Sequence, residues 1–307
     1  MSQSPTSRVE SSKSSPLLVA TDGREQSDGA VRGGALFGES MGGWRVVSAA
    51  PVIYRFAPEL DLHITAEAID VLRDEQRQAA ESQIRRVLGQ SACVDVEIGT
   101  GSPAEVITAV AARNNVSLIV CGLGRHRIVD RLLGDETALA IIRTAGKPVL
   151  AVPQEFAHAP RTAVVGIDFS EASIHAAQIA LTLIHGAATV YLVNVAPHEN
   201  VLNIVSGSLA AYEDRARAEL ELVASHLDVP PRVHVQPHVR QGDPGSELLQ
   251  YAKQTDAQLI AVGTRGQGFM ARLLLGSVAT KVVRASPITV LAIPSTDGAP
   301  DSATDRG

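Results

Sequence analysis

Cysteine is scarce in this chain: 307 residues contain only Cys93 and Cys121. Two thiols in such a length do not make a disulfide framework, and their spacing matches no zinc-binding pattern. Both lie in apolar sequence typical of strands, which Cys93 would begin and Cys121 would end. We therefore expect both thiols to be buried in the core and unpaired.

The chain also lacks long apolar runs and an excess of basic residues. No apolar stretch approaches the ~18 residues that a transmembrane helix requires. Residues 1–15 include seven serines and lack the apolar segment of a secretory signal. The net charge is −6 and the sequence pI is near 5.9, whereas a nucleic-acid or membrane-surface binder needs a basic face. These absences predict a cytoplasmic protein that binds neither nucleic acid nor membrane.

What the sequence does contain is a repeated alternation of strand-like and helix-like segments. Equivalent landmarks recur 141 to 146 residues apart, among them Asp22 and Asp168, Gly134 and Gly276, and the similar runs at 149–153 and 290–294. Such spacing indicates an internal duplication. Because strands and helices alternate within each copy, each copy is predicted to form a parallel sheet with helices on both faces.

This duplication suggests two domains between polar tails, and 307 residues suit two domains of about 150. We divide the chain into a disordered tail (1–15), a first domain (16–153), a linker (154–161), a second domain (162–294) and a disordered tail (295–307). Within the second domain, Pro237 interrupts the strand-like run 233–239. Proline cannot donate to a sheet ladder, so this run is predicted to be an edge strand.

A glycine-rich loop in the second copy carries the clearest chemical signal. Gly263, Gly266 and Gly276-Ser277 connect the apolar run 259–262 to a segment with helical spacing at 278–284. Glycine lets backbone N–H groups approach a ligand closely, and a helix N-terminus favours phosphate. Ser277 would cap that helix or donate its hydroxyl to a phosphate oxygen. The alternative is a flexible strand-to-helix connection that binds no ligand.

The spacing Gly-x2-Gly-x9-Gly-Ser resembles the nucleotide-binding signature of the universal stress protein family. The flanking residues 272–279 and the closing run 290–294 agree with it, and the duplicated unit covers nearly the whole chain. The resemblance implies two tandem, doubly wound, Rossmann-like α/β domains with strand order 3-2-1-4-5. It also implies ATP as the ligand, with Mg²⁺ accompanying it. Subunits of the family pair through their last strands; a tandem chain can make that pair internally, and whole chains can pair further as homodimers.

The implied strand order brings two distant parts of the second copy together. Ligands of open α/β sheets bind where the winding direction reverses, between the first and fourth strands. These strands end at Asp168 and Gly263. A carboxylate suits an adenine amino group or a ribose hydroxyl, and by resemblance Asp168 lies near the base, with Val195 offering main-chain contacts. Capping of the following helix is the alternative role for Asp168.

The phosphate end of this site would be formed by the loop. Gly263, Gly266, Gly276 and Ser277 are expected to hold ribose and phosphates, largely through backbone N–H groups. Arg265 is a candidate charge partner for the phosphates, as is Arg272. The alternative for both arginines is a solvated position on an exposed loop.

The first copy departs from this pattern. Its loop, 122–135, is one residue shorter, and Asp135 takes the place of Ser277. An aspartate caps a helix well, but two like charges ~4 Å apart cost about 1 kcal/mol in water and several times more in a drier cleft. Arg125, Arg127 and Arg131 would offset part of this repulsion. We expect a degenerate nucleotide site in this copy and a structural role as partner of the second.

Other chemistries find little support. The chain lacks a P-loop lysine, and 266–271 lacks the context of a dinucleotide site. His234 and His238 lie on one face of a strand about 13 Å apart, too far to share a metal ion. With no catalytic or metal-ligating residue assigned, three functions remain: an ATP-binding regulator in a stress response, a slow ATPase or autophosphorylating protein with Ser277 or Thr280 as acceptor, and a structural interaction protein without nucleotide.

Overall fold

The computed structural model describes residues 17–50, 65–124, 134–196, 209–264 and 275–295. Ten strands lie within these residues: β1 (Leu17–Ala20), β2 (Trp44–Ala50), β3 (Val96–Thr100), β4 (Leu118–Gly122), β5 (Val149–Val152), β6 (Thr162–Gly166), β7 (Ala188–Ala196), β8 (Val233–Gln241), β9 (Leu259–Gly263) and β10 (Thr289–Ile293). Apart from Ser295, the two proposed disordered tails lie outside the described residues.

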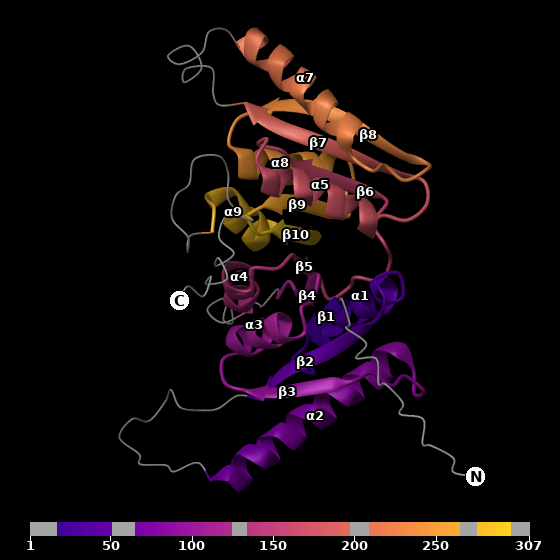
Figure 1. The fold of residues 1–307 in the computed structure, drawn as a ribbon, viewed down its shortest axis with the longest axis vertical. Coiled ribbons are helices and arrows are strands. Elements are labelled where there is room, and N and C mark those ends of the chain that lie inside the picture. Colours follow the sequence, from indigo (N-terminus) through magenta and orange to yellow (C-terminus); the bar gives the residue numbers. More distant parts are fainter. Residues whose placement is uncertain (1–16, 51–64, 125–133, 197–208, 265–274, 296–307) are drawn as a thin grey trace, which may run out of the picture.

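All ten strands belong to one sheet, which runs the length of the molecule (Figure 1). Its order is β3-β2-β1-β4-β5-β10-β9-β6-β7-β8. Read from its outer edge toward the centre of the sheet, each half has the order 3-2-1-4-5 that the family resemblance implied. Pairing is parallel within each half, and β5 pairs antiparallel to β10 where the halves meet. The predicted doubly wound α/β architecture is confirmed.

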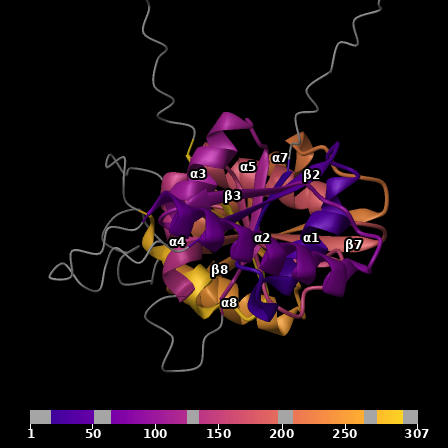
Figure 2. The ribbon, with the colours of Figure 1, turned by 90° about the horizontal axis from the view of Figure 1, so that it is seen from below.

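The helices cover both faces of this sheet. Their bounds are α1 (Asp28–Gly38), preceded by a 3₁₀ turn at Glu25–Ser27, α2 (Ala66–Leu88), α3 (Pro103–Arg113), α4 (Gly134–Thr144), α5 (Glu171–Leu183), α7 (Leu209–His226), α8 (Pro244–Gln254) and α9 (Ser277–Ala285). Buried apolar side chains form one cluster on each face of the sheet. Helices α1, α2, α5 and α7 pack on one face, and α3, α4, α8 and α9 pack on the other. Figure 2 shows α4 and α1 on opposite sides of the first half.

The junction between the halves has approximate two-fold symmetry. Leu150 of β5 lies opposite Leu291 of β10, with Val149 opposite Ala292 and Ala151 opposite Val290. The two leucines are 1% and 0% exposed. Because they occupy the same place in their repeats, the symmetry axis passes between them. The duplicated chain therefore makes, within one molecule, the pairing through last strands that the resemblance implied.

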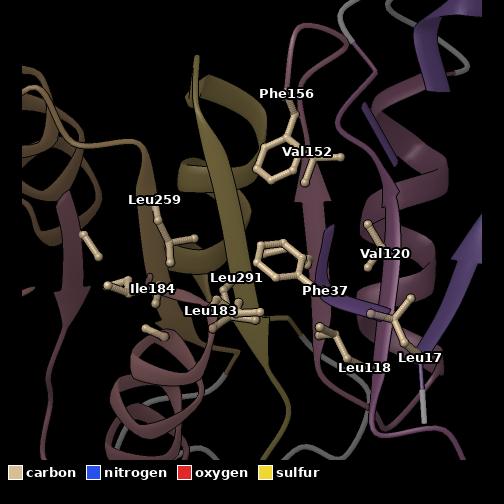
Figure 3. Packing of buried hydrophobic residues seen from close by; sticks show 14 of the residues in the cluster. Leu17, Phe37, Leu118, Val120, Val152, Phe156, Leu183, Ile184, Leu259 and Leu291 are labelled. Atoms are coloured by element: carbon tan, nitrogen blue, oxygen red, sulfur yellow. The ribbon is translucent and has the colours of Figure 1, made fainter. Parts of the chain in front are cut away.

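Residues of the proposed linker contribute to the core at this junction. Phe156 is buried, and its ring centroid lies 6.0 Å from that of Phe37 on α1. The ring of Phe37 lies 6.2 Å from that of His185, which follows α5, so it bridges the halves; Figure 3 shows it between Leu291 and Leu118. Arg32 donates to the main-chain oxygen of Gln154 at 2.8 Å. This connection is anchored by packing and hydrogen bonds.

Two predictions about individual strands had different outcomes. Pro237 lies on β8, which ends the sheet, so the predicted edge position is confirmed. Cys121 is buried on β4, but Cys93 is exposed and precedes β3. The expectation of two buried thiols was therefore wrong for Cys93: β3 begins only at Val96, although the preceding residues have strand-like composition. Among the described helices, none is long and apolar enough to cross a membrane.

The junction provides a first testable prediction. Leu291→Ala removes a fully buried side chain at the symmetry axis and should cost about 2–5 kcal/mol of stability, because the β5–β10 contact cannot collapse around the void. A lower urea midpoint, followed by circular dichroism, would report this loss. Leu222→Ala, at a side chain that is 59% exposed, is the matched control and should change stability by less than about 0.5 kcal/mol. Equal midpoints for the two variants would contradict the junction described above.

Candidate functional site

A cavity of about 360 Å³ opens at the carboxyl ends of β6, β7 and β9. This is the position at which the winding direction of the second half reverses, because β6 is paired with β7 on one side and β9 on the other. The first turns of α8 and α9 complete its walls. Among the seven site residues predicted from sequence, five line it: Asp168, Val195, Gly263, Gly276 and Ser277. Arg265 and Gly266, together with Arg272, lie outside the described residues.

Asp168 stands just after β6 and is exposed to solvent. One of its carboxylate oxygens, Oδ1, accepts hydrogen bonds from the backbone N–H of Ser170 at 3.1 Å and from its hydroxyl at 2.5 Å. Ser170, in turn, is the N-cap of α5, accepting from the N–H of Ser173. Asp168 thus orients the capping residue and does not itself cap the helix. Among the described residues, its second oxygen, Oδ2, has no hydrogen-bond partner and remains available to a ligand.

The end of β7 contributes a polar residue that the sequence analysis missed. Asn194 is 5% exposed and lines the cavity beside Val195. Its Nδ2 donates to the carbonyl oxygen of Ile167 at 2.8 Å, and its Oδ1 accepts from the hydroxyl of Tyr212 at 3.0 Å. Asn194 therefore fixes the backbone immediately before Asp168. An asparagine inside an apolar strand was the signal available in the sequence.

Gly263 has a packing reason to be glycine. A Cβ at this position would lie 3.1 Å from the Cβ of Ala172 and 3.2 Å from the backbone nitrogen of Ser173. The first turn of α5 thus approaches the end of β9 so closely that a side chain would press against it. Gly263 lines the cavity. The close approach of α5 is enough to explain why this residue is glycine, so its identity is not evidence for a ligand.

The two ends of the loop that follows β9 are joined by one hydrogen bond. The N–H of Gly276 donates to the carbonyl oxygen of Thr264 at 2.7 Å, and the N–H of Thr264 donates to Ile293 on β10 at 2.8 Å. The amide of Gly276 is therefore already used. It closes the loop, and the expectation that it would bind phosphate through a free N–H was wrong in this respect.

The N-terminus of α9 nevertheless presents N–H donors that no described residue is seen to engage. Gly276 is the N-cap, and Ser277 is the first helical residue, exposed beside the cavity. The expectation that Ser277 caps the helix was therefore wrong; its hydroxyl is one position further along. Within α9 the N–H of Thr280 is accepted by Gly276 at 3.0 Å, whereas the first-turn N–H groups at 277–279 have no carbonyl one turn back to accept them. They give this wall a partial positive charge.

A charged contact joins the two helices that line the cavity. Lys281 of α9 donates to Oδ1 of Asp243 at 2.6 Å and to the hydroxyl of Ser246 at 2.7 Å. Asp243 is the N-cap of α8 and accepts from the N–H of Ser246 at 2.9 Å. The bond from Lys281 and those from Ser246 lower the pKa of Asp243 to about 2. The contact holds the first turns of α8 and α9 in register.

The first half contains a similar cavity of about 400 Å³ in the corresponding place. Its lining includes Asp22, Gly122 and Ala138, of which the last two stand 141 positions before Gly263 and Ala279 of the other cavity. The side chains at 134–136 lie outside the described part of the chain, so the expectation that Asp135 takes the place of Ser277 stays a prediction.

The described side chains do not form a metal-ligating group at either cavity. Within the described part of the chain, no group of three or more His, Cys, Asp or Glu residues could hold a metal ion. Burial raises the pKa of the Cys121 thiol to about 12, so this residue of the first cavity is a neutral wall and not a nucleophile at neutral pH.

Comparison with known proteins connects this fold to one family. The universal stress protein family profile matches residues 14–153 and 160–294. A universal stress protein of Mycolicibacterium smegmatis is 27% identical over 301 residues, which are 93% of this chain and 99% of that protein. One from Mycobacterium tuberculosis is 28% identical over 230 residues, or 71% and 76% of the two chains. The crystal structure of a universal stress protein from Archaeoglobus fulgidus aligns with a TM-score of 0.65 at 20% identity, covering 93% and 98%, which supports the fold.

The α8–α9 contact predicts a specific pH dependence. The pKa of Asp243 is lower in the folded chain than the ordinary aspartate value of 3.8, so its carboxylate contributes stability above about pH 4 that is lost as the pH falls toward 2. Lys281→Met should raise the pKa of Asp243 and so reduce the stability that is lost on acidification. A ¹³C NMR titration of the carboxyl group measures it, with Lys253→Met, an exposed lysine at the other end of α8, as the control. An unchanged pKa in Lys281→Met would refute the contact.

Proposed function

The chain belongs to the universal stress protein family, and from this premise we propose that its second half binds ATP and that nucleotide occupancy regulates conformation or partner binding in a stress response. The observation that carries the proposal is the meeting of Asp168 and the N-terminus of α9 at one cavity, although 109 positions separate Asp168 from Ser277. A carboxylate at one side and a helix N-terminus at the other match the two chemically different ends of a nucleotide.

The roles of the residues follow from this polarity. Oδ2 of Asp168 would accept from the adenine amino group or a ribose hydroxyl, and Val195 would contribute main-chain contacts. The first-turn N–H groups of α9 and the hydroxyl of Ser277 would hold phosphate oxygens. Gly263 and Gly276 shape this end, the first by admitting α5 and the second by closing the loop. Arg265 and Gly266 are retained as proposed phosphate contacts.

We further propose that Mg²⁺ arrives with ATP and is held mainly by the phosphates. Coordination mainly by phosphate suits the donors present, because the described residues contain no group of three or more metal-ligating side chains and Mg²⁺ readily keeps water and phosphate ligands.

The proposed domain limits, 16–153 and 162–294, assign all the described lining residues of this cavity to the second domain.

The residues that line the cavity favour ATP binding over ATP hydrolysis. Asp168 is the one acidic residue among the described lining residues, and it is assigned to the nucleoside end. The phosphate end therefore lacks, among these residues, a carboxylate to activate water or to bind the metal. Slow hydrolysis or phosphorylation of Ser277 would require a group supplied from elsewhere.

An ATP titration of the intact chain tests this proposal. We expect one ATP per chain by isothermal titration calorimetry, and at least tenfold weaker binding for Gly276→Asp/Ser277→Asp, because added carboxylates at the helix N-terminus repel the phosphates. Ala285→Asp adds a carboxylate at the opposite end of α9 and should leave the affinity unchanged. Mass spectrometry of nucleotide released from the freshly purified protein is an independent measurement. Absence of ATP in both experiments would rule out the proposed function.

A further inference from the structure

The ten-stranded sheet ends in two outermost strands, β3 at one end and β8 at the other (Figure 1). Just before β3, the carbonyl oxygen of Asp95 accepts from β2 at 2.9 Å, and just after it the N–H of Gly101 donates to β2 at 3.3 Å. Because backbone groups alternate in direction along a strand, those of Val96 and Ile98 point away from the sheet. Such an outward row of backbone groups is a template on which another strand can add.

Two arginines of α2 engage the outward carbonyl groups of β3. Arg77 donates to the carbonyl oxygen of Val96 at 2.6 Å, and Arg73 donates more weakly to that of Ile98 at 3.4 Å. A strand added at this edge would need the same two oxygens as acceptors for its own N–H groups. The two guanidinium groups therefore close the β3 edge, and they do so from a helix that packs on β3.

The outward side of β8 is closed in a different way. Just before this strand, the carbonyl oxygen of Arg232 accepts from Ala188 of β7 at 3.2 Å. Just after it, the N–H of Gly242 donates to Ala196 of β7 at 3.1 Å. The odd-numbered residues of β8 therefore direct their backbone groups outward, and Pro237 is the middle one among them. Proline has no N–H to donate, and its ring fills the place that a carbonyl group of an added strand would take.

These two closures occupy the same place in their halves. Ser48 of β2 and Asn194 of β7 are equivalent, because each donates to the carbonyl oxygen just before the aspartate of its cavity. Two residues earlier on these strands, the paired residue of the edge strand is Val96 in the first half and Pro237 in the second. Pro237 therefore stands at the position whose carbonyl oxygen Arg77 covers in the first half.

The helix beside β8 explains why no arginine is used there. Gln76 of α2 and Tyr212 of α7 are equivalent, because each donates to the polar residue near the end of the second strand of its half. One residue further along, α2 has Arg77 and α7 has Glu213. An ionised carboxylate cannot donate to a carbonyl oxygen, so Glu213 cannot replace the arginine, and Pro237 closes the edge instead.

We propose that Arg77, assisted by Arg73, and Pro237 are equivalent edge-closing residues that prevent a second copy of this chain from adding strand to strand at either end of the sheet. The inner edges of the two half-sheets are already paired with each other by β5 and β10. A homodimer of whole chains would therefore have to form through helices or loops. None of the three residues is among the described lining residues of the proposed ATP cavity, so this proposal and the proposed function can fail separately.

Sedimentation velocity of the full chain over a range of concentrations tests the closure of both ends. Arg73→Met/Arg77→Met and Pro237→Val should each form dimers, with self-association roughly tenfold or more tighter than in the unmodified chain, because several backbone hydrogen bonds are gained. The combined variant has both ends open and should form assemblies larger than dimers. Arg85→Met is the matched control on α2, because Arg85 forms its ion pair within the helix, with Glu81 at 3.6 Å; it should sediment as the unmodified chain does.

A rescue variant separates an opened edge from misfolding. Glu213→Arg places an arginine where α2 has Arg77, and in the Pro237→Val chain it should reverse the self-association by covering the carbonyl oxygen of residue 237. The proposal is overturned if either edge variant sediments as the unmodified chain does, or if Glu213→Arg leaves the association of Pro237→Val intact. It is also overturned if the unmodified chain forms dimers in which the outward amides of Val235 and Val239 resist hydrogen exchange, because β8 would then be paired with another strand.

Discussion

The antiparallel contact between β5 and β10 is the constraint on which the arrangement of this molecule depends. Each half is a parallel sheet that would otherwise end in an unpaired last strand, and exposed strand edges invite association with other chains. Pairing the two edges satisfies both sets of backbone groups and buries Leu150 against Leu291. Since the axis between these leucines relates the two repeats, each described strand of one half has a counterpart in the other.

This symmetry determines where the two cavities lie. Parallel strands within a half place all their carboxyl ends at one edge, and the antiparallel junction directs the carboxyl ends of the halves to opposite edges of the sheet where they meet. The two cavities are therefore separate sites. They are still connected through packing, because α4 and α9, which line them, contact each other across the junction.

Duplication also explains why the two sites can differ while the fold stays the same. The aspartate side of each cavity depends on the ends of the first two strands of its half and on a helix packed behind them, all of them part of the core. The phosphate side depends on the first turn of a single helix at the surface. In the first half the sequence of this turn contains Asp135 and Glu136, residue types that suit a helix N-terminus.

The sequence by itself determined the α/β alternation, the duplication, the edge position of Pro237 and the residues at which strands meet the cavity, because each is encoded by neighbouring residues: hydrophobic period, turn chemistry and the spacing of glycines. The strand order and the pairing of last strands came from the resemblance to a family. Only the tertiary structure showed the buried Asn194, the engaged amide of Gly276, the packing reason for Gly263 and the exposure of Cys93. These depend on contacts between segments far apart in the chain, where burial and hydrogen-bond partners are decided by packing across the sheet and not by the local sequence.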